Sequence, residues 1–138
     1  MGMYISPVKK TDERETPDTF FAALDTEFHF TLDAAATAAN TKCSQFLTLV
    51  DNALEQKWVG TVWLNPPYSQ LGLWIAKAYQ EYCRGATVVC LVPSATDTCW
   101  WHMYATHAEV RFIKGRIRFK GMASGAPFPS ALLIFRHT

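Results

Sequence analysis

The chain alternates between two hydrophobic periods, one typical of helices and one typical of strands. Apolar residues recur every three or four positions in three stretches, which predicts helices over 20–24, 71–82 and 97–106. Alternating or continuous apolar runs predict strands over 28–32, 61–64, 87–92, 110–120 and 131–135. The segment 37–52 fits a short helix and a short strand, the strand around 46–47. Because strands alternate with helices, the predicted fold class is α/β with a mainly parallel sheet.

The first helix has a recognisable start. Thr16 can cap a helix, Pro17 suits the first helical position, and Asp18 favours the positive end of the helix dipole. Residues 1–15, which precede this start, are polar and predict a flexible N-terminal tail. We therefore expect a single folded domain over 16–138.

Composition agrees with one globular domain, but the charge is unevenly distributed. The 138 residues are 49% apolar and 14% aromatic, which is enough for one hydrophobic core. Residues 1–104 carry seven Lys and Arg against eleven Asp and Glu, a net charge of −4. Residues 105–138 carry six against one, a net charge of +5. The overall charge of +1 thus conceals a basic segment suited to an anionic partner.

Several function classes are not indicated by the sequence. None of the four cysteines belongs to a C-x-x-C pair, and no cysteine or histidine cluster has the spacing of a zinc site. We therefore expect free thiols and no metal. No apolar run approaches the ~20 residues that cross a bilayer, and the N-terminus lacks the apolar stretch of a signal peptide. These absences predict a cytoplasmic protein without membrane association.

The motif Asn65-Pro66-Pro67-Tyr68 has the clearest chemical meaning. It follows the apolar run 61–64, at the carboxyl edge of the predicted sheet, where open α/β folds bind ligands. An exocyclic amine of a nucleobase is a weak nucleophile because its lone pair is delocalised into the ring, and hydrogen-bond acceptors on its N–H groups counteract this. The Asn65 amide oxygen can supply one acceptor, and the Pro66 carbonyl, stiffened by Pro67, can supply the other. Tyr68 offers a flat face on which an extruded base can stack. The alternative is a plain strand-to-helix turn.

Taken in order, a longer set of motifs resembles the small phage-type DNA adenine-N6 methyltransferases, the phage Dam family. The resemblance extends from about Thr16 to Phe135. Its motifs are Thr16-Pro17, Leu32-Asp33-Ala34-Ala35-Ala36, Asp51, Ala53-Leu54, Trp58, Trp63-Leu64-Asn65-Pro66-Pro67-Tyr68-Ser69, Val92-Pro93, Asp97-Thr98, Trp100-Trp101 and Gly115-Arg116. It implies a truncated Rossmann-like fold, and a catalytic role for Asn65-Pro66-Pro67-Tyr68.

The resemblance also implies S-adenosylmethionine as the cofactor. Thr16 and Pro17 would contact its methionine end, although Thr16 could instead be an ordinary helix cap. Asp33 would hold the ribose or the amino end, although it could instead form a turn. Asp51 would meet the adenine, with a solvated loop carboxylate as the alternative. Asn65 completes this set.

One position departs from the usual pattern of methyltransferases. Ala34 and Ala35 stand in the loop that is glycine-rich in many of these enzymes. Alanine is small enough for close approach to the cofactor, but it does not adopt a positive φ cheaply. We expect both alanines to line the cofactor all the same.

The basic segment is the candidate for DNA binding. Its basic residues alternate with Gly115, Ile117 and Phe119, so a strand would place every basic residue on one face, where phosphates could be contacted. These basic residues are Lys114, Arg116, Arg118 and Lys120. The alternative is a solvated edge strand, since Lys and Arg blunt sheet edges. The absence of neighbouring acids in the sequence favours DNA.

These observations together predict an enzyme that methylates N6 of adenine in DNA in a bacterial or phage-infected cell. Alternatives with the same chemistry are cytosine N4, RNA adenine or a glutamine amide as the acceptor. An alternative of another class is a DNA-binding module that has lost catalysis. No separate base-recognition domain fits into the chain, so DNA must be held by this domain or by a second copy of it, with a homodimer as one arrangement.

Overall fold

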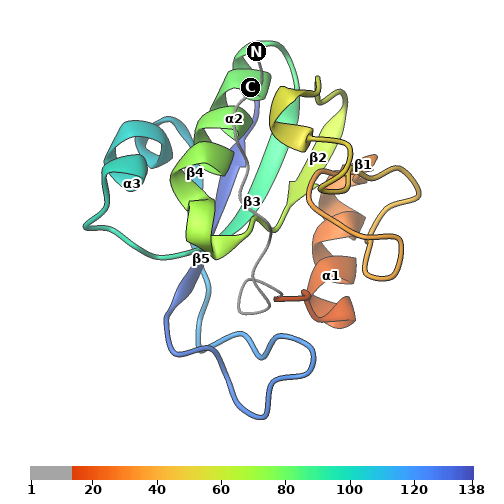
Figure 1. The fold of residues 1–138 in the computed structure, drawn as a ribbon. Helices are drawn as coiled ribbons and strands as arrows, with labels where there is room; N and C mark the ends of the chain where they lie inside the picture. The colour runs from red at the N-terminus through yellow and green to blue at the C-terminus, as the bar shows by residue number, and fades with distance from the viewer. Residues whose placement is uncertain (1–13) are drawn as a thin grey trace.

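Five strands form one mixed sheet in the computed structural model, which describes residues 14–138. The strands are β1 (Leu32–Asp33), β2 (Thr61–Leu64), β3 (Thr87–Pro93), β4 (Glu109–Phe112) and β5 (Ser130–Phe135). Their order across the sheet is β1-β2-β3-β5-β4 (Figure 1). The pairings β1–β2 and β2–β3 are parallel, whereas β3–β5 and β4–β5 are antiparallel.

Helices and a long loop cover the two faces of this sheet. The helices of the described chain are α1 (Asp18–Phe28), α2 (Leu71–Cys83) and α3 (Cys99–Tyr104), and short 3₁₀ turns follow at Ala53–Glu55, Tyr68–Gln70 and Ala105–His107. On one face, α2 and α3 bury alternate strand residues such as Val62, Leu64 and Cys90. On the other face, α1 and the loop 113–129 bury the intervening residues, such as Trp63 and Val89. The central strands are apolar throughout because both faces are covered.

The fold confirms most of the elements predicted from the pattern. The expected strands over 61–64, 87–92 and 131–135 correspond to β2, β3 and β5, and the helices expected over 71–82 and 97–106 correspond to α2 and α3. The first helix begins at Asp18, one residue later than its start signal predicts, because Pro17 stands at the N-cap position and not at the first helical position. Of the tail predicted over 1–15, residues 1–13 lie outside the described residues.

The strand predicted over 28–32 is wrong. Phe28 still belongs to α1, and His29 ends that helix in the left-handed conformation, with φ 56°. Sheet pairing begins only at Leu32. Phe28 and Phe30 lie on the same side of the chain, with ring centroids 5.6 Å apart. Their alternation therefore comes from the end of a helix and not from a pleated strand.

The expectation of a mainly parallel sheet is also wrong, because two of the four pairings are antiparallel. A parallel return needs a crossover that is usually helical. The connection 113–129 between β4 and β5 contains no helix, so β5 runs back beside β4 and inserts between β4 and β3. What the structure shows is a mixed α/β fold.

The strand predicted over 110–120 stops at Phe112. The Ile113 N–H still donates to the carbonyl of Ser130 in β5 (3.1 Å). Farther along, the backbone bonds outside the sheet: the Lys120 N–H donates to the Glu15 carbonyl (2.9 Å), and the Ala126 N–H donates to the Ile117 carbonyl (2.8 Å). The predicted alternation in burial nevertheless holds, since Ile117 and Phe119 are buried and the four basic residues between 114 and 120 are exposed.

Candidate active site

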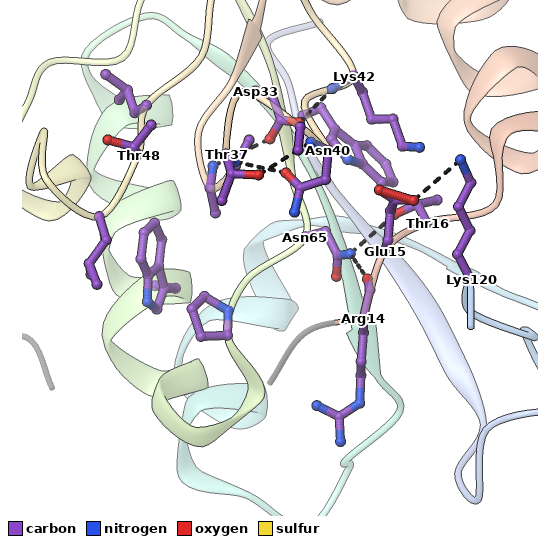
Figure 2. A pocket seen from close by; sticks show the side chains of 18 of the residues that line it. Arg14, Glu15, Thr16, Asp33, Thr37, Asn40, Lys42, Thr48, Asn65 and Lys120 are labelled. Atoms are coloured by element: carbon purple, nitrogen blue, oxygen red, sulfur yellow. Dashed lines mark hydrogen bonds and ion pairs between the residues drawn. The ribbon is translucent and has the colours of Figure 1, made fainter. Parts of the chain in front are cut away.

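Four loops of the chain leave the sheet at the same edge. Because β5 is antiparallel to both β3 and β4, the strand β4 points the same way as β1, β2 and β3. The loops that follow these four strands therefore gather at one edge, where open α/β sheets bind ligands. A pocket of about 650 Å³ opens there, lined by residues from 14–16, 33–49, 63–67 and 120–121 and by Trp74 (Figure 2). Its volume falls within the range of small-molecule sites.

The Asn65 side chain is held in one orientation at the end of β2. Its Nδ2 donates to the backbone carbonyl of Arg14 and to Thr16 Oγ1, the latter at 3.1 Å (Figure 2). A carbonyl can only accept, so the amide nitrogen must face Arg14 and the amide oxygen must face away from it. Asn65 Oδ1 is buried and has no hydrogen-bond partner among the described residues. Buried polar atoms are nearly always paired, so this oxygen is suited to a donor supplied by a ligand.

This contact corrects the role considered for Thr16 as a helix cap. Pro17 occupies the N-cap position of α1, and no side chain caps that helix. Thr16 is only 1% exposed, and its hydroxyl instead accepts from Asn65 and lines the pocket. Pro17 fixes the chain between Thr16 and α1 and does not line the pocket.

The two prolines place the next residues against α2. Pro66 and Pro67 are both buried, and Pro67 lines the pocket. No backbone N–H of the described residues donates to the Pro66 carbonyl, whereas the Pro67 carbonyl accepts from Gln70 in the short turn that leads into α2. The backbone of the motif is thus a strand-to-helix turn that leaves the Pro66 carbonyl available as an acceptor.

Tyr68 lies in a small aromatic cluster and not on an open surface. Its ring contacts Phe119 edge-on, with centroids 6.4 Å apart, and Phe128, with centroids 5.5 Å apart. The Arg14 guanidinium carbon lies over the Tyr68 ring, 4.7 Å from its centroid. The Tyr68 hydroxyl is buried and has no hydrogen-bond partner among residues 14–138, and burial raises the pKa of this group. The guanidinium thus covers one face of the Tyr68 ring.

Asp33 is a buried carboxylate in the wall of the pocket. It is 3% exposed, and it accepts from the backbone N–H groups of Lys42 (2.9 Å) and Ala35 (3.3 Å). Desolvation raises its pKa to about 6, against these hydrogen bonds and the charge of Lys42. A positively charged partner would stabilise the ionised form of this buried carboxylate.

The alanine loop fits its place without strain. In the described chain, only His29 and Asn52 among the residues other than glycine have a positive φ, so neither Ala34 nor Ala35 needs the conformation that alanine disfavours. Ala35 lines the pocket, while Ala34 is fully buried beside it in the core. Alanine can therefore stand where glycine is usual in this loop.

Asp51 does not line the pocket. Its carboxylate accepts from the backbone N–H and the hydroxyl of Thr48, at 2.8 and 3.0 Å, which closes the turn 48–51. Thr48 and Leu49 from this turn do line the pocket. The contact predicted between Asp51 and the adenine of the cofactor stays a prediction.

The four basic residues predicted to bind DNA have unlike surroundings on the loop 113–129. Lys120 lines the pocket and pairs with Asp18 (2.8 Å) and Glu15 (3.3 Å), so its acidic neighbours come from the other end of the chain. Arg116 and Arg118 bond to backbone carbonyls of the same loop, those of Ala126 and Met122. Lys114, Arg116 and Arg118 form no ion pair within residues 14–138.

Comparison with known proteins identifies the family. The model of the family "DNA N-6-adenine-methyltransferase (Dam)" matches residues 5–137. The chain belongs to this family. It is 33% identical over 128 residues to a DNA N-6-adenine-methyltransferase of Haemophilus phage HP1, covering 87% of this chain and 74% of the relative. It is 31% identical over 99 residues to one of Escherichia phage T1, covering 70% of this chain and 42% of the relative, so it spans less than half of that protein.

Within this Dam family chain, several residues of the pocket carry no signal in the sequence. Arg14 and Glu15 fall in the predicted flexible tail, and Asn40, Lys42 and Trp74 belong to no recognised motif. Polar residues in an unpatterned segment give no periodic signal, so nothing in the sequence places Arg14 beside Asn65. For Trp74, an aromatic residue at helical spacing predicts the core and equally fits a pocket wall.

Two further observations on residues 14–138 concern metal-ligating clusters and membrane-spanning helices. No three or more His, Cys, Asp or Glu side chains of the described chain lie close enough together to hold a metal ion. Over the same residues, no helix has the length and apolar character needed to cross a membrane.

Proposed function

We propose that this chain transfers a methyl group from S-adenosylmethionine to the N6 amine of adenine in DNA. The observation that carries the proposal is the buried, unpartnered Oδ1 of Asn65, whose amide is oriented by the Arg14 carbonyl. An acceptor that is fixed before the substrate arrives costs no reorganisation during the reaction. Membership of the family supports adenine in DNA as the acceptor.

The pocket residues fit the cofactor. Asp33 provides a buried carboxylate for its ammonium group or its ribose hydroxyls, and Thr16 provides a hydroxyl beside Asn65. An apolar part of the wall suits a flat ring and is formed by Leu47, Leu49 and Trp74. The indole Nε1 of Trp74 is buried and has no hydrogen-bond partner in the part of the chain that the structure describes. When bound, S-adenosylmethionine supplies an electrophilic methyl group on a positively charged sulfur.

The role of the motif follows from the charge that develops on the amine. The cofactor would supply the methyl group and leave as a neutral thioether, and the N6 nitrogen would carry a positive charge until it loses a proton to water. Asn65 Oδ1 and the Pro66 carbonyl would accept from its two N–H groups and stabilise this charge. Pro67 would keep the turn stiff, and Tyr68 would stack on the base.

We also propose a truncated Rossmann-like methyltransferase domain over 16–138. Four strands of common direction, with their loops gathered at one edge, support this assignment. We infer that Lys114, Arg116, Arg118 and Lys120 contact DNA phosphates, since the loop that carries them follows β4 at the pocket edge. The site of action would be the cytoplasm of a bacterial or phage-infected cell, where the DNA is.

The test is incubation of the full chain with methyl-labelled S-adenosylmethionine and bacterial DNA that lacks adenine methylation, followed by nucleoside analysis. We expect label in N6-methyl-2′-deoxyadenosine. Label in N4-methyl-2′-deoxycytidine, or none in the presence of measurable cofactor binding, would contradict the proposal. Asn65→Ala serves as the inactive control.

A further inference from the structure

The Arg14 guanidinium covers two adjacent aromatic rings, those of Tyr68 in the motif and Phe128. The centroids of these two rings lie 5.5 Å apart, with an interplanar angle of 59°. The Arg14 guanidinium carbon lies 4.7 Å from the Tyr68 centroid and 5.8 Å from that of Phe128. A flat cation thus occupies the place on Tyr68 where a flat base would stack.

Arg14 and a base cannot share this place. Flat groups in van der Waals contact lie about 3.5–4 Å apart, so a base between the guanidinium and the ring would need roughly 7–8 Å. The observed separation of 4.7 Å leaves no room for it. Phe119 and Phe128 also contact the Tyr68 ring, with centroids 6.4 and 5.5 Å away, and take up part of the space around it.

The backbone of this segment is anchored, whereas the guanidinium is not. The Arg14 carbonyl accepts from Asn65, and the Glu15 carbonyl accepts from the Lys120 N–H at 2.9 Å. The Glu15 carboxylate also pairs with Lys120 Nζ at 3.3 Å. By contrast, Arg14 forms no ion pair in the described part of the chain, and its Nη1 is buried without a hydrogen-bond partner. The attraction of a cation to an aromatic face is thus opposed by the cost of an unpaired, desolvated nitrogen.

We propose that Arg14 is a reversible cover of the base-stacking platform on Tyr68. The guanidinium occupies the platform in the absence of DNA, and a base that enters displaces the side chain while the backbone stays on Asn65. The inference rests on the proposed function, in which Tyr68 stacks the target base. It gives Arg14 a role that its position ahead of the first helix does not suggest.

The test uses 2-aminopurine deoxyriboside, a fluorescent adenine analogue whose emission falls when it stacks on an aromatic ring. This nucleoside needs no recognition sequence, so the measurement does not depend on the DNA site. It is titrated into the wild-type chain, Arg14→Ala, Arg14→Gln and the double variant Arg14→Ala/Tyr68→Leu. Lys57→Ala, which removes an exposed charge ahead of β2 at the opposite edge of the sheet, controls for charge. Thermal unfolding confirms that each variant is folded.

We expect both Arg14 variants to bind the nucleoside at least about fivefold more tightly than the wild type, which corresponds to a platform that is open at most about one fifth of the time. The gain should vanish in the double variant and be absent in Lys57→Ala. Unchanged or weaker binding by the folded Arg14 variants would overturn the cover, as would a gain that persists without Tyr68. Adenine methylation is assayed separately with the wild type, so that its absence would refute the proposed function while the nucleoside result still decides the role of Arg14.

Discussion

Replacement of Asn65 tests the two ends of its side-chain amide, the acceptor Oδ1 and the donor Nδ2. In Asn65→Ala, the acceptor Oδ1 is lost, and the Arg14 carbonyl and Thr16 Oγ1 lose their donor. By analogy with the loss of one oxyanion-hole donor, turnover should fall about 10²-fold, which is about 2.7 kcal/mol of transition-state stabilisation. The unpaired buried acceptors should cost about 1–3 kcal/mol of unfolding free energy, or roughly 3–5 °C in Tm per kcal/mol.

Asn65→Asp gives the sharper test. The chemistry of the amide alone predicts that this variant retains part of the activity, because it keeps an acceptor. The structure predicts otherwise, because a carboxylate oxygen would replace Nδ2 and face the Arg14 carbonyl and Thr16 Oγ1. The Arg14 carbonyl should raise the pKa of the new carboxyl, since only the protonated form of that carboxyl can donate to it. Activity relative to wild type should therefore decline as the pH rises through that raised pKa.

The assay is single-turnover methylation of DNA between pH 5.5 and 8.5, together with thermal unfolding and DNA affinity. Asn52→Gly is the matched control, because it removes an amide that does not line the pocket while glycine keeps the φ of 54°. DNA affinity should barely change in any variant. A folded Asn65→Ala protein that methylates adenine at the wild-type rate would refute the mechanism, and a pH-independent, near wild-type Asn65→Asp would refute the role of Arg14 in orienting the amide.

The remaining predictions concern Asp33, the basic loop and Tyr68. Burial raises the pKa of Asp33 to about 6, so calorimetry should find that cofactor affinity rises with pH through 6 as the carboxylate forms. The Asp33→Asn variant should bind the cofactor weakly, with an affinity that does not depend on pH. A wild-type affinity that falls as the pH rises would contradict this role of Asp33. Replacing Arg116 and Arg118 by Ala should flatten the salt dependence of DNA binding by about 0.9 per lost phosphate contact while cofactor affinity is kept, and an unchanged slope would make them solvated loop residues. Tyr68→Phe removes a buried, unpartnered hydroxyl, so it should keep activity and leave Tm equal or higher, whereas Tyr68→Ala should lose about 1–3 kcal/mol of base contact in affinity measurements.

The central strands, the second helix and the position of the motif could all be predicted from local patterns in the sequence. The apolar runs of β2, β3 and β5 and the helical spacing of α2 are local patterns, and burial on both faces makes them continuous and easy to read. Because Asn65 directly follows a strand and precedes a helix, its place at the carboxyl edge of the sheet could be inferred without knowledge of any partner.

The surroundings of that motif depend on contacts between segments that are distant in the sequence. The donor–acceptor pairs that orient Asn65 join residues 49 and 51 positions apart, and the segment that supplies them shows no hydrophobic period. The same holds for Lys120, whose acidic partners stand more than 100 positions earlier in the chain. Hydrogen bonds and ion pairs depend on where backbone segments meet, whereas a single sequence records chiefly which residues are buried and at what spacing. The element patterns were therefore readable, and the identity of the groups that complete the site was not.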